Sequence, residues 1–141
     1  MIQLDDTIRS RIARAIDDLV PVTVAYIESS GKPHIAFYGS THVHGDAQLA
    51  IWVRNANGAL PRTLPDHPDV ALIYGNIKDR VYITFEGQAR ITADPAERDR
   101  VFQEMHPIEQ RFDAERKGVA VVVDLRRVTI LSAATGRQVL E

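Results

Sequence analysis

The connections between the apolar, β-branched segments of this chain are short, and they constrain its fold more than any other feature. Segments of this kind cover residues 22–28, 34–41, 48–54, 70–74, 80–92, 119–125 and 128–131. Most connections hold only a few residues, whereas a crossover between parallel strands needs a dozen or more. We therefore expect a mainly β fold with flanking helices, in which six or seven antiparallel strands bury one face by curling into a barrel.

Three helices are expected to flank this sheet. The first begins at Asp5 or Asp6 and ends before Pro21. Residues 94–97 read DPAE, a capping box with proline at the first helical position, and predict a second helix. A polar third helix is expected over residues 108–117.

Three strands are apolar on both faces, namely residues 22–27, 70–74 and 119–123. One face of each can pack inside the barrel, and the other has to meet a helix or a second subunit. A symmetric homodimer is the commonest way to cover such a face. Within the longest strand, Gly87 predicts a bulge or sharp bend.

Length and composition exclude several classes of protein. The 141 residues suit one domain with one core. The 17 cationic residues are scattered among 19 acidic ones, which argues against a nucleic-acid partner. No cysteine is present, so disulfides and thiolate metal sites are excluded. No apolar run reaches the ~20 residues that span a bilayer, and the acidic N-terminal segment lacks a signal-peptide pattern, so we expect no membrane partner and a cytoplasmic protein.

The loop that follows the strand 48–54 has some features of a phosphate site. Asn57 and Gly58 precede a possible helical turn, and Arg54 and Arg62 lie on either side of it. Backbone N–H groups at a helix start, together with arginines, suit a phosphate. The same residues also suit a plain connection, so the local pattern leaves both interpretations open.

Other catalytic or metal-binding patterns are weak. His42 and His44 lie on one face if their segment is a strand, but a metal ion needs at least one more ligand, so we expect exposed histidines at a strand end. The chain has no G-x-S-x-G elbow, no G-x-G-x-x-G and no P-loop, which excludes the corresponding hydrolase, Rossmann and NTPase interpretations.

The order of the segments resembles the pyridoxamine 5′-phosphate oxidase-like, FMN-binding split-barrel family. The resemblance covers about residues 5–132 and depends as much on order and spacing as on particular residues. It rests on the stretches GKPHIAF (31–37), LAIWVRN (49–55), LPDHPDVALIY (64–74) and RVYITFEGQARI (80–91), followed by the capped helix and the last apolar strand. It implies a single FMN-binding split-barrel domain over residues 1–141 and a homodimer with the cofactor in grooves at the interface.

The resemblance also implies which residues contact the cofactor. In that family the flavin ring lies along the strand that matches residues 34–40, and the phosphate is held by the loop after the strand that matches residues 48–54. Tyr38 and Tyr82 are therefore implied for the ring or ribityl chain, and Arg80 for the same groove. The implied phosphate contacts are Arg54, Asn55, Asn57, Gly58 and Arg62.

This chain departs from the family pattern at the phosphate loop. Family members usually carry a threonine at the strand end, then a serine and a lysine or arginine. Here those positions read Arg54, Gly58, Ala59 and Leu60. The phosphate is then bound in a rearranged way, or the cofactor is a deazaflavin, haem or none.

The function implied is a flavin- or deazaflavin-dependent oxidoreductase acting on a small-molecule substrate. No catalytic side chain is implied, because the flavin itself carries the hydride chemistry. A binding protein without catalysis, for a flavin-like ligand or haem, is the alternative.

Overall fold

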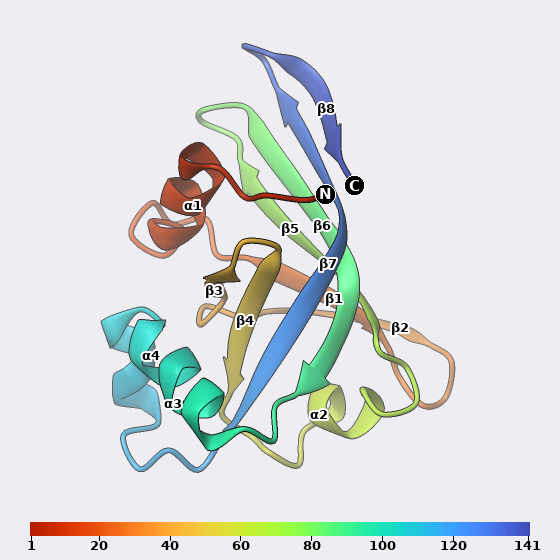
Figure 1. Ribbon diagram of the computed structural model, residues 1–141, viewed down its shortest axis with the longest axis vertical. Coiled ribbons are helices and arrows are strands. Elements are labelled where there is room, and N and C mark those ends of the chain that lie inside the picture. The colour runs from red at the N-terminus through yellow and green to blue at the C-terminus, as the bar shows by residue number, and fades with distance from the viewer.

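Eight strands form one antiparallel sheet, and four helices flank it (Figure 1). The structure is a computed structural model that describes residues 1–141. The strands are β1 (Thr23–Ile27), β2 (Pro33–Phe37), β3 (His42–Gly45), β4 (Gln48–Val53), β5 (Asp69–Asn76), β6 (Val81–Ile91), β7 (Val119–Ser132) and β8 (Gly136–Leu140). The helices are α1 (Asp6–Ala13), α2 (Ala59–Thr63), α3 (Pro95–Glu104) and α4 (Pro107–Phe112). The mainly antiparallel β fold with flanking helices is confirmed.

The strand number is eight, and the expectation of six or seven was wrong for three reasons. Residues 119–125 and 128–131 are one continuous strand, β7, because the exposed Arg126 and Arg127 interrupt the apolar pattern while the strand continues through a register shift at Arg126. The two histidines at 42 and 44 lie in a short separate strand, β3. The C-terminal segment pairs with β7 as β8, through a turn at Gly136 with a φ of 73°.

The strands are ordered β2-β1-β5-β6-β7-β4-β3, with β8 added to β7. The first half of β7 pairs with β4 and its second half pairs with β8, while β6 follows it on the other side. The expected bulge is confirmed, since the β6–β7 register shifts between Glu86 and Gly87. A Cβ on Gly87 would lie 2.3 Å from the Asp124 carbonyl oxygen, so no larger residue fits there.

The main core lies inside the curled sheet and is closed by α1 and α2. Alternate residues of β4 and β7, such as Leu49, Ile51 and Val121, point into it and are at most 1% exposed. Ile8 and Ile12 of α1 pack on the same cluster. This alternation explains why one face of the apolar strands is buried in the barrel.

A second, smaller cluster lies between the outer face of β4 and β7 and the helix α3. Trp52 of β4 is 2% exposed, and its ring meets Phe102 of α3 edge-on, with centroids 5.0 Å apart. The Trp52 indole N–H donates to Asp113 at 2.8 Å, and the Arg98 guanidinium lies over the indole at 4.8 Å. For β4 and β7, therefore, a helix covers the second apolar face.

The starts of the helices agree with the sequence predictions better than their ends do. Asp5 caps α1 by accepting from the Ile8 N–H at 2.9 Å, but α1 ends at Ala13, before the expected Pro21. Asp94 caps α3, yet Glu97 does not return to the Asp94 N–H as a capping box requires, because its carboxylate binds other side chains. The polar helix α4 ends at Phe112, short of residue 117. None of the four helices is long and apolar enough to cross a membrane.

Candidate functional site

A cavity of about 330 Å³ lies at the end of β4, where the chain leaves the sheet for α2. Three segments and one α4 side chain form its wall: residues 37–40, 52–55 and 58–61, together with Glu109. The volume falls within the range of roughly 300–1,000 Å³ that small-molecule sites occupy. The cavity therefore has the size and the mixed apolar and polar lining of a ligand site.

The loop in this wall is held by Asn55. The Asn55 Oδ1 accepts the Asn57 N–H at 3.1 Å, and its carbonyl accepts the Gly58 N–H at 2.9 Å. The Arg62 N–H then donates to the Gly58 carbonyl at 3.2 Å, four residues back. The N–H groups of Ala59 and Leu60 come before that bond and have no intrahelical acceptor. They are free backbone donors at the cavity wall, although a helix of five residues adds little macrodipole.

The charges around the cavity are uneven. Arg54 is exposed, lies over the Phe112 ring at 5.0 Å, and forms no ion pair with a carboxylate. Glu109 faces it from α4 and lies so close to Gly39 that a Cβ there would be 2.8 Å from Glu109 Oε1. An anion is therefore favoured at the Arg54 and α2 side of the cavity and disfavoured beside Glu109.

Tyr38 is fixed by its backbone in the wall of the cavity. Its N–H donates to the Val22 carbonyl at 3.0 Å, and its own carbonyl accepts the Thr41 hydroxyl at 2.7 Å. Burial raises the pKa of the Tyr38 phenol above its ordinary value of 10.0. The phenol stays protonated at neutral pH and can donate a hydrogen bond to a ligand.

Four of the eight residues implied by the resemblance come together in this cavity, and four do not. Those in the wall are Tyr38, Arg54, Asn55 and Gly58. Asn57 is exposed at the loop and contributes its backbone to the Asn55 turn. Arg62 points to a separate hollow lined by Glu28, Ser29 and Ser30.

Arg80 and Tyr82 lie at the other end of the sheet. Arg80 ends the β5–β6 turn with a φ of 54°, and Tyr82 pairs with Gly75 and Leu131. The cavity lies beside α2, at the end of the sheet where β5 begins and Asp69 pairs with Gln88 (Figure 1). Eight residues of strand, roughly 26 Å, separate Gln88 from Arg80. Within one chain these two residues cannot share a ligand with Arg54, and their assignment stays a prediction that needs a second copy.

An exposed apolar face beside the cavity is absent from the sequence predictions. Ile35 and Phe37 of β2 are 67% and 71% exposed, and Ile73 of β5 is 44% exposed. The register places Phe37 and Ile73 on either side of Thr23, so their side chains lie on one face. Phe37 also lines the cavity. The alternating apolar residues Ile35 and Phe37 are the sequence pattern that could have predicted this face.

The histidines of β3 were also misjudged. His42 and His44 are 7% and 8% exposed, not exposed at a strand end as expected, because α3 packs over β3. Burial lowers the pKa of His42 below its ordinary 6.5, although the Ser40 carbonyl and the Glu104 carboxylate oppose this shift. His42 is therefore a neutral imidazole at pH 7.

No protein-family model matches the chain, and no curated protein sequence matches it. Solved structures do. A pyridoxamine 5′-phosphate oxidase-related, FMN-binding protein from Nostoc punctiforme superposes with a TM-score of 0.67 at 14% identity, over 92% of this chain and 83% of that one. General stress protein 26 from Bacillus anthracis superposes with a TM-score of 0.66 at 18% identity, over 94% and 98% of the two chains.

A third similar structure is a haem-binding protein from Mycobacterium smegmatis, with a TM-score of 0.68 at 14% identity, over 94% of this chain and 57% of that one. At these identities the likeness establishes the fold. The fold is the split barrel of the pyridoxamine 5′-phosphate oxidase-like proteins.

Proposed function

We propose that this chain is a homodimeric flavin-binding protein, with FMN or a deazaflavin in the cavity between β2, β4 and α2, and that it oxidises or reduces a small molecule. The observation that carries this proposal is the cavity itself, in which Tyr38, from the segment after β2, meets Arg54, Asn55 and Gly58 of the loop after β4. The similar structure from Nostoc punctiforme, described as FMN-binding, supports the same class of ligand.

The two sides of the cavity suit the two ends of a flavin. At one side, Arg54 and the free N–H groups of Ala59 and Leu60 provide a positive charge and two donors for a phosphate. From β2 and the residue after it, Phe37 provides an apolar surface and Tyr38 a neutral hydroxyl donor. The usual serine and basic residue of the family are absent, so in this proposal Arg54 supplies the charge from the end of β4.

The proposed dimer covers the exposed apolar face. Ile35, Phe37 and Ile73 lie together on β2 and β5, and large apolar patches of this kind are rare on monomers unless they serve an interface. Strand β2 is also an edge strand, whose unpaired backbone groups favour a partner. Because Phe37 belongs to both this face and the cavity, a second copy would lie against the bound cofactor and exclude water from it.

The chemistry in this proposal comes from the cofactor, which supplies hydride transfer when bound. The chain's own residues bind and orient it: Arg54 balances the phosphate charge, Tyr38 donates a hydrogen bond, and Phe37 excludes water. No general base is required of the chain.

Titration with FMN and with a deazaflavin tests the proposal. We expect a shifted visible absorption band and quenched flavin fluorescence, with saturation in the micromolar range. A size-exclusion experiment should show twice the mass of one chain. No spectral change with either cofactor well above micromolar concentration, or a clean monomer, would contradict it.

The alternative is a protein of the same fold that binds a flavin-like ligand or haem without catalysis. The similar haem-binding structure supports it, and so does His34 on exposed β2, whose Nδ1 faces Glu28 at 3.1 Å. His106 is less suited, because Asp17 and the Ile108 N–H already occupy its two nitrogens. A Soret band that is lost in His34→Ala favours haem, and bound flavin that no nicotinamide or reduced deazaflavin can reduce favours binding alone.

A further inference from the structure

Two histidines of β3 and one glutamate at the end of α3 converge on the other side of Tyr38 and Gly39 from the cavity wall described above. One ring nitrogen each of His42 and His44 and one carboxylate oxygen of Glu104 lie within 4.8 Å of one another. An ion with bonds of about 2.0–2.1 Å in tetrahedral geometry holds its ligand atoms about 3.4 Å apart. The ligand atoms would therefore have to approach one another by at most about 1.4 Å, and the Glu104 side chain is exposed enough to move.

His42 has one nitrogen fixed and the other left over. Its Nδ1 lies 2.7 Å from the Ser40 carbonyl, which can only accept, so Nδ1 carries the proton. The lone pair is then on Nε2, which is buried and has no hydrogen-bond partner in the chain. A buried polar atom without a partner is uncommon and costs stability, unless something else binds it.

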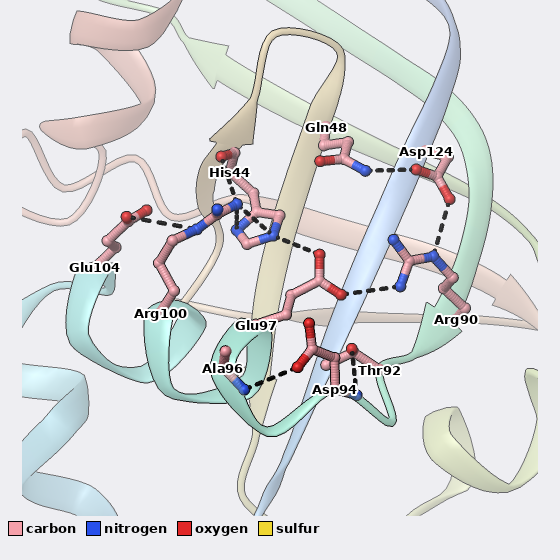
Figure 2. Close-up of polar contacts among 10 residues, drawn as sticks. All are labelled: His44, Gln48, Arg90, Thr92, Asp94, Ala96, Glu97, Arg100, Glu104 and Asp124. Carbon is pink, nitrogen blue, oxygen red and sulfur yellow. Dashed lines mark hydrogen bonds and ion pairs between the residues drawn. The ribbon is translucent and has the colours of Figure 1, made fainter.

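His44 is oriented in the same manner by a carboxylate. Its Nε2 lies 3.0 Å from Glu97 Oε2, and the His44 side chain is 0% exposed. Glu97 is in turn held by Arg90 at 3.1 Å, and Arg90 by Asp124 at 3.2 Å, as Figure 2 shows. Histidines that bind metals almost always donate their other N–H to a carboxylate or a backbone carbonyl. Both histidines of this cluster have such a partner.

Arg100 holds the place of a cation between His44 and Glu104 (Figure 2). Its NH2 group is 2.9 Å from His44 Nε2 and 3.2 Å from Nδ1, and its Nε is 3.7 Å from Glu104 Oε1. The Arg100 side chain is 50% exposed, so it can swing into solvent without leaving a cavity in the core. The guanidinium therefore lies over the face of the His44 ring, and its departure would leave the in-plane lone pair of His44 Nδ1 and the Glu104 carboxylate open to another cation.

We propose that His42, His44 and Glu104 bind a divalent first-row transition-metal ion, which displaces the Arg100 guanidinium. Two imidazoles and one carboxylate are a ligand set that suits zinc and its neighbours and leaves at least one coordination position open. His42 and Glu104 line a hollow of about 400 Å³, which gives the ion an entry route and gives the open position room for water or a substrate. Tyr38 and Gly39 line both this hollow and the proposed cofactor cavity, so the two sites adjoin.

Titration of the full chain with Co²⁺, followed by competition with Zn²⁺, tests this inference without any cofactor. We expect one Co²⁺ per chain, with a dissociation constant at or below about 1 µM, that is −8.2 kcal/mol. The bound ion should show the intense visible absorption of low-coordinate cobalt. Glu97→Gln, which removes the carboxylate behind His44, should weaken binding about 10- to 100-fold.

Matched variants separate a metal site from an ion-pair network. His42→Ala and Glu104→Gln should each weaken Co²⁺ binding at least about tenfold, since they remove a ligand. Glu104 is 45% exposed, so its variant folds even if removal of buried His42 does not. His67→Ala, in the loop before β5, should leave affinity unchanged, and Arg100→Ala should tighten it. The inference is overturned if Co²⁺ shows only the weak spectrum of its aqua ion, if Glu104→Gln binds as tightly as the natural chain, or if His67→Ala weakens binding as much as His42→Ala.

Discussion

Two polar regions of this molecule differ in how their charged groups are partnered. Around the cavity at the end of β4 and the neighbouring hollow, Arg54 and Arg62 are exposed and pair with no carboxylate. Around α3, by contrast, His44, Glu97 and Arg90 are linked by contacts of 3.0–3.1 Å. Unpaired surface cations add little to folding and remain available to a ligand, whereas buried partnered groups are costly to disrupt. We infer that the first region serves binding and that the second also serves stability.

Strand β4 connects the two regions. Trp52 points outward into the α3 cluster, and Arg54, two residues later, reaches the cavity. Gly118 lies against the junction, because a Cβ on it would be 2.3 Å from the Val53 carbonyl oxygen and 2.8 Å from Trp52 Nε1. The contrast between the two polar regions can therefore be tested on residues that are neighbours at the end of β4.

The largest expected effect is on the α3 side, in Trp52→Ala. Trp52 is 2% exposed and packs on Phe102, so truncation should lower the free energy of unfolding by about 3–5 kcal/mol. Trp52 is the only tryptophan, so urea unfolding has to be followed by circular dichroism. The matched control on the cavity side is Phe112→Ala, which removes a 56% exposed ring and should cost at most about 1 kcal/mol. Equal losses of unfolding free energy in the two variants would contradict the proposed difference in stability between the two regions.

A smaller effect is expected from Asp113→Asn. Although burial alone raises the pKa of the Asp113 carboxyl, the Trp52 indole N–H and the N–H groups of Lys117 and Gly118 donate to it, and the net pKa lies below the ordinary 3.8. The variant weakens charge-assisted bonds and should lose about 1.5–3 kcal/mol of unfolding free energy at neutral pH.

The pH dependence of that loss has a definite sign. A carboxyl whose pKa is lowered by folding stabilises the protein above its unfolded pKa, and this contribution is lost as the pH falls through the folded value. The difference between the natural chain and Asp113→Asn should therefore be full at neutral pH and shrink below pH 3.8. Asp99→Asn, which breaks the exposed pair with Arg116, is the control and should cost no more than about 1 kcal/mol. A loss of stability in Asp113→Asn that grows toward acid pH would contradict a lowered pKa of Asp113 in the folded protein.

The sequence predicted what depends on neighbours along the chain and missed what depends on topology. Short connections gave the antiparallel sheet, and the residues 54–58 are close in space because they are close in sequence. The Asp94 cap was predicted correctly, but Glu97 turned away from its expected bond to bind His44, which lies 53 residues earlier. His42 and Glu104 likewise meet only because α3 folds back over β3. No periodicity in either segment encodes that contact, so the buried cluster could not be foreseen.

The smallest expected effect on stability, and the sharpest on binding, comes from Arg54→Ala. It should change the free energy of unfolding by no more than about 0.5 kcal/mol, because the side chain is exposed. If Arg54 pairs with the cofactor phosphate, the lost contact of about 1.5–3 kcal/mol weakens FMN binding roughly tenfold to a hundredfold. Riboflavin, which lacks the phosphate, should bind both forms alike.

Arg62→Ala is the matched variant, since Arg62 points to a separate hollow, and it should weaken FMN binding less than about threefold. If Arg62→Ala weakens FMN binding more than Arg54→Ala does, the phosphate lies in the hollow beside Glu28. If Arg54→Ala weakens FMN and riboflavin binding equally, Arg54 does not contact the phosphate.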